Sequence, residues 1–139
     1  MAFESAGAGV LFLVARVLFG GVLAFMGLNH FMNGAAMTGY AEAKGLPAPS
    51  AAVYGSGGLL ALSGLLIILG AYPVVAAGAL ASFLLVSAVT MHDFWAAPDE
   101  QKQDEMTQFL KNVAMAGGAV ALLAAAGTAW PYSVGLGAF

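Results

Sequence analysis

Four stretches of the chain are long and apolar enough to cross a lipid bilayer. They lie at about residues 7–30, 51–70, 73–91 and 99–128, and the apolar part of the last one begins near Phe109. A helix needs about 20 mainly apolar residues to span the hydrocarbon core, because each residue adds only about 1.5 Å of length. The sequence therefore predicts an all-α, membrane-spanning, up-down four-helix bundle, folded as one domain over residues 1–139.

The composition fits a membrane protein and excludes several classes of function. Of the 139 residues, 61% are hydrophobic and 8% are charged, whereas a soluble domain has roughly 25% charged residues. The net charge of −3, with no basic cluster, argues against a nucleic-acid partner. The chain has no cysteine, which excludes disulfides, thiolate nucleophiles, Fe–S clusters and cysteine-ligated zinc. Any redox chemistry must therefore come from a cofactor or a partner.

The connections between the spans decide which helix ends lie together. The connection at 71–73 is too short for anything but a tight turn, and Pro73 suits the first turn of a helix. The second and third spans are therefore expected to form an antiparallel hairpin. Between the first two spans, the run 40–44 predicts a short helix at the membrane surface, ended by Gly45 and Pro47.

Polar side chains are expected to gather at one end of this bundle. The first and third spans end there, the second and fourth begin there, and that end collects the lysines and every acid except Glu4. The positive-inside rule then places this end in the cytoplasm and both termini outside, in a multi-pass protein of the cell membrane. The residues before the first span lack the basic region of a signal peptide, so that span is expected to remain as a helix.

The candidate ligand-binding residues are polar side chains in or beside the spans. Histidine can bind a metal or haem, or transfer a proton near neutral pH. Two histidines on facing helices are a weak sign of haem, and no metal site is predicted. Structural hydrogen bonding and contact with a quinone both remain open for the histidines. The candidates are Arg16, Asn29, His30, His92, Asp93, Gln108 and Asn112.

Arg16 lies inside the first span, where a charged side chain is costly and usually faces the interior of the bundle. No carboxylate is expected at its depth, so its candidate partners are the hydroxyls of Ser63 or Ser82, backbone carbonyls or a bound ligand. Two interpretations remain open. Arg16 either acts structurally, by joining helices or reaching the nearer interface, or it holds an oxygen of a ligand.

The start of the fourth helix carries a polar face. Glu105, Gln108 and Asn112 have the i, i+3, i+7 spacing of one helical face, which we expect to turn toward the two histidines. Glu105 taken alone is more typical of a solvated helix start.

Asp93 directly follows His92, and neighbouring side chains on a helix point about 100° apart, so the two are expected to serve different neighbours. The expected partner of Asp93 is Lys111 or His30. We expect His30, His92, Asp93 and Asn112 to cluster at one end of the bundle.

Two other residue types have structural interpretations. The spans are rich in glycine, including the pairs at 20–21, 57–58 and 117–118, and glycine lets helices approach closely in lipid. Aromatic side chains near the ends of the spans, such as Tyr40 and Trp95, are typical of anchors at the membrane interface.

With these residues in place, the chain resembles the DoxX family of small bacterial and archaeal membrane proteins. The resemblance covers nearly the whole length and rests on RVLFG (16–20), GLNHF (27–31), GLPAP (45–49), MHDFW (91–95) and EMTQFLKN (105–112), in this order and spacing. It implies a four-helix membrane fold. The family is named from subunits of archaeal quinol oxidase and thiosulfate:quinone oxidoreductase assemblies, and some relatives are associated with oxidative stress or thiol chemistry. A direct thiol role would need a cysteine, which this chain lacks.

Two functions are carried forward. In the first, the protein is an accessory subunit of a quinone-linked membrane redox complex and contacts a quinone, with other subunits or further copies of itself as partners. In the second, it is a structural or assembly protein whose polar end docks a partner and binds no ligand. A transporter is disfavoured, because the four spans show no inverted repeat. Whether the protein is itself an enzyme is left open.

Overall fold

The computed structural model describes residues 2–137 of the chain, in which the regular structure is entirely helical. The elements are α1 (Ala6–Met32), α2 (Gly34–Ala43), α3 (Pro49–Leu69), α4 (Pro73–Met91), the 3₁₀ turn η1 (Phe94–Ala96) and α5 (Asp99–Ala125). Four of them, α1, α3, α4 and α5, are long and apolar enough to span a membrane. The predicted all-α fold with four spanning helices is therefore confirmed, and the observed boundaries differ only slightly from the predicted ones.

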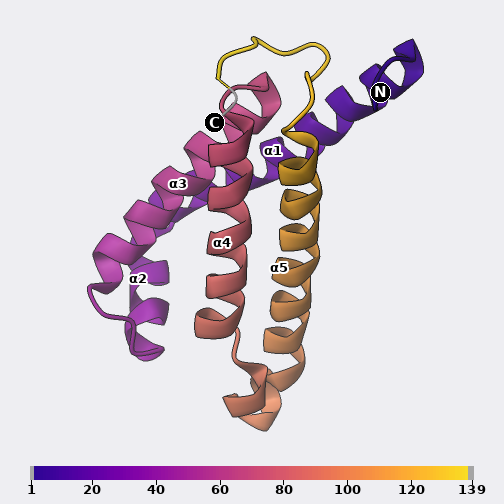
Figure 1. Cartoon of the computed structure of the whole chain (residues 1–139). Coiled ribbons are helices and arrows are strands. Elements are labelled where there is room, and N and C mark those ends of the chain that lie inside the picture. The colour runs from indigo at the N-terminus through magenta and orange to yellow at the C-terminus, as the bar shows by residue number, and fades with distance from the viewer. Residues whose placement is uncertain (1, 138–139) are drawn as a thin grey trace.

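The bundle is built from two helix pairs, because α1 packs along α3 and α4 packs along α5 (Figure 1). A tight turn joins α3 to α4. Gly70 ends α3 with a φ of 67°, a left-handed conformation that glycine adopts without strain, and Pro73 begins α4. Figure 1 shows α3 leaving this turn at an angle to α4, so the two arms of the predicted hairpin diverge toward the other end of the bundle.

The outward faces of the spanning helices are apolar. Along α1, Leu11 is 71% exposed, Leu18 65% and Phe25 63%. A soluble monomer rarely exposes a continuous apolar surface of this kind, whereas lipid tails solvate it without cost. The interior between the helices is filled by smaller and branched side chains, including Leu23, Leu60, Ile67, Leu80 and Leu84. The surface therefore fits a bilayer, and the chain is a multi-pass membrane protein.

Glycines hold α1 and α3 in close contact. A Cβ on Gly64 would lie 2.5 Å from the carbonyl oxygen of Gly20, and a Cβ on Gly27 would lie 2.5 Å from the backbone nitrogen of Ala61. Both distances are far below van der Waals contact, so any larger residue would push the helices apart. In lipid, where helix association lacks a hydrophobic drive, such close backbone contact supplies the packing energy.

Arg16 ties α1 to α3 and to the segment that follows α5. Its guanidinium nitrogens donate hydrogen bonds to the backbone carbonyls of Pro131 at 2.5 Å, Tyr132 at 2.8 Å and Ile68 at 2.9 Å. Carbonyls in the last turn of a helix and in irregular segments lack helical partners, and in lipid water cannot replace them. Arg16 therefore satisfies backbone groups that would otherwise be unpaired.

Arg16 faces the interior as predicted, and among its candidate partners it binds the backbone carbonyls. Within residues 2–137, Arg16 makes no hydrogen bond to Ser63 or Ser82, and Ser82 is exposed. Instead the guanidinium lies 5.7 Å from the ring centroid of Phe12 and 5.6 Å from that of Trp130. The sequence did not identify which carbonyls bind Arg16, because two of them belong to a C-terminal segment that folds back onto α1 and lies outside the spans.

The glycine contact generates a matched test on one helix. A Cβ on Gly64 would collide with α1, whereas a Cβ on Gly58 meets nothing within 4 Å. Both alanine substitutions bring the same gain in helix propensity, about 1 kcal/mol. The difference between their free energies of unfolding therefore measures the cost of disturbing the contact between Gly64 and α1. We expect Gly64→Ala to be less stable than Gly58→Ala by about 1–3 kcal/mol, in the free energy of unfolding from SDS titration in mixed micelles. Equal stabilities would show that this contact does not hold α1 on α3.

A second test concerns Arg16. Lysine keeps the positive charge but loses the planar fork that reaches carbonyls on two segments. We expect Arg16→Lys to lower the free energy of unfolding by about 2 kcal/mol and to make residues 126–137 more sensitive to limited proteolysis. Lys102→Gln, on the half-exposed side chain of Lys102, is the control and should change neither measurement. An Arg16→Lys protein with wild-type cleavage would contradict the anchoring role.

Candidate functional site

A cavity of about 780 Å³ lies between the diverging halves of α3 and α4. The cavity also has walls from α1, α2 and α5, so no single helix pair builds it. Its volume falls within the range of about 300–1,000 Å³ that is usual for small-molecule sites. Most of the lining is apolar, including Met26, Met37, Val53, Leu59, Leu60, Phe83 and Leu84.

Polar side chains line part of the same cavity. Four of the predicted site residues, His30, His92, Gln108 and Asn112, are in its wall together with Lys111. They come from the last turn of α1, the residue that caps α4 and the first half of α5. Residues that are far apart in the sequence are thus brought to one apolar chamber.

The other three predicted site residues lie outside the cavity lining. Arg16 is bound to backbone carbonyls near the turn between α3 and α4. The side-chain oxygen of Asn29 accepts a hydrogen bond from Asn33 at 2.5 Å, which keeps that amide on its own helix. Asp93 has an ion pair with Lys44 at 2.6 Å.

The expected pairing of Asp93 with Lys111 or His30 is therefore wrong. Asp93 follows the end of α4 and Lys44 caps the end of α2, and the two ends meet at the polar end of the bundle. The path of the connection through α2 decides this pairing. Periodicity within the spans contains no information about that path.

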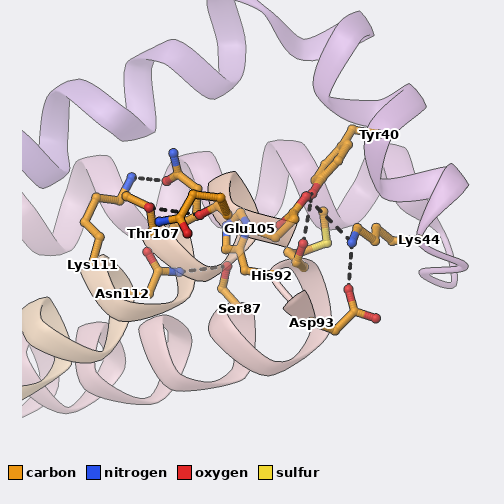
Figure 2. A network of polar contacts seen from close by, with 12 residues as sticks. Tyr40, Lys44, Ser87, His92, Asp93, Glu105, Thr107, Lys111 and Asn112 are labelled. Carbon is orange, nitrogen blue, oxygen red and sulfur yellow. Dashed lines mark hydrogen bonds and ion pairs between the residues drawn. The ribbon is translucent and has the colours of Figure 1, made fainter. Parts of the chain in front are cut away.

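Glu105 is the centre of a polar network that joins α2, α4 and α5 (Figure 2). Its carboxylate accepts a hydrogen bond from the hydroxyl of Tyr40 and lies 2.9 Å from Nδ1 of His92. Nζ of Lys44 lies 3.8 Å from the same carboxylate and 2.6 Å from that of Asp93. Glu105 is only 7% exposed, so the expectation of a solvated side chain is wrong. A buried carboxylate needs partners, and α2 and α4 supply them.

The charges of this network are nearly balanced. Asp93 and Glu105 face the single ammonium group of Lys44, and His92 adds a second positive charge when it is protonated. Partly buried charges persist only when they are paired in this way. Burial raises the pKa of Tyr40, and its hydrogen bond to Glu105 raises the pKa further, so the hydroxyl remains a neutral donor.

Two further contacts orient polar side chains in the cavity wall. Nζ of Lys111 donates to the side-chain oxygen of Gln108 at 2.5 Å, and Nδ2 of Asn112 lies 3.4 Å from the hydroxyl of Ser87. Within the described residues, no three histidine, aspartate or glutamate side chains are grouped so that they could hold a metal ion. The wall therefore offers a ligand imidazole, amide and ammonium groups for hydrogen bonding.

Comparison with known protein families identifies the family of this chain. Residues 11–93 match the family model described as DoxX, which is more than half of the chain. The chain belongs to the DoxX family. No curated protein and no solved structure matches it. The matched part of this DoxX protein begins within α1, includes α2 to α4 and both histidines, and ends before α5. The resemblance expected over nearly the whole length is therefore shown for this part only.

Sequence reasoning missed Tyr40, Lys44 and Glu105 as site residues of this DoxX protein. Tyr40 was interpreted as an interface anchor, and its hydroxyl instead points into the network in Figure 2. For Glu105 the signal was its i, i+3, i+7 spacing with Gln108 and Asn112, the face expected to turn toward the histidines. Glu105 does contact His92, and Asn112 on the same face is 4% exposed.

The network generates a test at Tyr40. Tyr40→Phe keeps the ring and removes the hydrogen bond to Glu105, so we expect the free energy of unfolding at neutral pH to fall by about 1–2 kcal/mol. The pKa of Tyr40 is raised in the folded protein, so its contribution is fully present below about pH 10, the ordinary tyrosine value, and is lost as the pH rises further. Above pH ~10 the wild type should therefore lose stability more steeply than Tyr40→Phe.

The measurement is the free energy of unfolding in mixed micelles from neutral to alkaline pH. Tyr72→Phe is the control, because Tyr72 lies exposed at the turn between α3 and α4, away from the network. Parallel pH profiles for the wild type and Tyr40→Phe would contradict the assigned hydrogen bond.

Proposed function

We propose that this DoxX protein binds a membrane quinone in its cavity and acts as an accessory subunit of a quinone-linked redox complex in the cell membrane. The observation that carries the proposal is the cavity itself, about 780 Å³ with largely apolar walls and a few hydrogen-bonding side chains. A quinone likewise combines a large apolar part, its ring and tail, with a few polar atoms, its two carbonyl oxygens. Pockets for such ligands combine apolar walls with a small number of placed polar groups.

The position of the cavity supports entry of a ligand from the lipid. Val86 and Thr90 on α4 and Gly55 on α3 line the cavity and are also exposed on the outer surface of the spanning helices. Val86 is 60% exposed. Since the outer surface of these helices faces lipid tails, a lipid-soluble ligand would reach the cavity between the diverging arms of the hairpin.

The composition supports an accessory role. The chain has no cysteine, so thiol chemistry or a cysteine-ligated Fe–S cluster would have to come from a partner. Residues 99–104 at the start of α5 are exposed and mostly charged or amide-bearing. They offer a partner subunit a polar surface near the histidine end of the cavity. In the competing function, this surface docks a partner and the cavity holds no quinone.

A cavity-filling substitution tests the proposal. Ala52 lines the cavity, and a phenylalanine there would occupy part of its volume. We expect Ala52→Phe to weaken binding of a decyl-substituted benzoquinone at least about tenfold, measured by equilibrium dialysis with protein in lipid nanodiscs. Ala121→Phe, at an exposed position of α5 outside the lining, is the matched control and should bind like the wild type.

The same preparation separates the two functions. Quinone extracted from the purified wild type, together with saturable binding of the analogue, is the result expected for the subunit role. If the wild type contains no quinone and binds no analogue, the quinone proposal is wrong and the docking function takes its place.

A further inference from the structure

Both histidines of the chain line the cavity, and in both the Nδ1 atom is already engaged. Nδ1 of His30 lies 2.7 Å from the backbone carbonyl oxygen of Met26, one turn earlier on α1. Nδ1 of His92 lies 2.9 Å from Oε2 of Glu105. A carbonyl oxygen and a carboxylate can only accept hydrogen bonds, so each Nδ1 must carry the proton and donate it.

This arrangement decides what the other ring nitrogen offers. A neutral imidazole has one N–H, and when Nδ1 carries it, Nε2 presents a lone pair and accepts. No hydrogen bond to Nε2 of His30 or His92 is found within the described residues, and neither atom is buried without a partner. Two accessible acceptors, one from α1 and one from the end of α4, therefore remain in residues of the cavity wall.

We propose that the cavity selects the reduced, hydroxyl-bearing form of its ring ligand, a quinol, over the oxidised quinone. This inference rests on the proposed function, because it assumes that a ring of the quinone class occupies the cavity. The two oxygens of a quinone only accept hydrogen bonds and would face the lone pair of each Nε2. The two hydroxyls of a quinol donate, so each can bind an Nε2 atom.

Glu105 is a positioning residue in this proposal, since it holds His92 in the tautomer whose Nε2 accepts. The backbone of α1 does the same for His30, and no substitution of a side chain removes that contact. The two acceptors therefore differ in how they can be tested. The His92 acceptor depends on the carboxylate, and the His30 acceptor depends only on the helix.

The preference should depend on pH. Protonation of an imidazole adds a hydrogen at Nε2 and turns the acceptor into a donor, which suits a quinone oxygen. The charged and titratable groups around His92 are Glu105 from α5, Tyr40 and Lys44 from the region of α2, and Asp93 on its own segment.

Lys111 on α5 lines the same cavity as the two histidines, and its ammonium group donates a hydrogen bond to Gln108. An ammonium group only donates hydrogen bonds, so Lys111 favours a quinone oxygen whichever form the histidines take. A change in preference on acidification therefore reports on the histidines.

The experiment compares the decyl-substituted benzoquinone with its hydroquinone, each bound to the intact 139-residue chain in nanodiscs under anaerobic conditions. We expect the wild type at pH ~8 to bind the hydroquinone at least about fivefold more tightly, the equivalent of one hydrogen bond. The ratio of the two affinities should fall at acidic pH, because a protonated imidazole donates from Nε2 instead of accepting. The ratio is informative because general damage to the fold lowers both affinities together.

Glu105→Gln tests the positioning role. The amide of glutamine can donate as well as accept, so it no longer selects one tautomer of His92, and the preference for the hydroquinone should shrink toward unity. Asp104→Asn makes the same change from carboxylate to amide one residue earlier on α5, at an exposed position outside the network, so it is the matched control and should keep the wild-type ratio. If Glu105→Gln does not fold, the pH dependence of the affinity ratio in the wild type still tests whether the histidines set the preference.

The outcomes are distinct. A wild type that binds neither ring form overturns the proposed function and this inference with it. A wild type that binds both forms equally, or whose ratio is unchanged by pH and by Glu105→Gln, overturns the inference and leaves the proposed function standing. A pH-dependent preference for the hydroquinone that Glu105→Gln reduces and Asp104→Asn retains supports both.

Discussion

Lipid tails provide no hydrogen-bond partners, so a polar group in the spanning part of this protein must find its partner within the chain. Arg16 meets this requirement with backbone carbonyls from α3 and from the segment after α5. Glu105 meets it with Tyr40 and His92. The first contact holds the C-terminal segment against α1 and α3, and the second holds α2 against α4 and α5. Both ends of the bundle are therefore joined by polar contacts, and the middle by apolar packing.

Packing between the helices explains where the cavity lies. Glycines bring the backbone of α3 against α1, as the contacts at Gly20 and Gly64 show, while α4 lies along α5. The two pairs run at an angle to each other in Figure 1, and the short turn at Gly70 lets α3 and α4 touch closely only near that turn. Away from the turn the arms separate, and the space between them is bounded by α2 and by the polar start of α5. The apolar cavity between α3 and α4 is therefore a consequence of pairing α1 with α3 and α4 with α5.

The polar network serves the fold and the candidate site together. Tyr40 and Lys44 bind α2 over the ends of α4 and α5, and they do so through Glu105 and Asp93. The same carboxylate of Glu105 orients the ring of His92, which is a residue of the cavity wall. A contact that stabilises the position of α2 therefore also determines which hydrogen-bonding group the cavity offers to a ligand.

The sequence by itself determined the four spanning helices, the hairpin at Pro73 and the gathering of His30, His92 and Asn112 at one end, because apolar run length and short connections leave few alternatives in a bilayer. It also placed Arg16 in the interior. Only the tertiary structure decided the partners. The contacts of Arg16 with the segment after α5, and of Lys44 and Tyr40 with α4 and α5, depend on how non-spanning segments fold back. Helical periodicity does not encode those paths, since they result from long-range packing and from buried polar groups that must be paired.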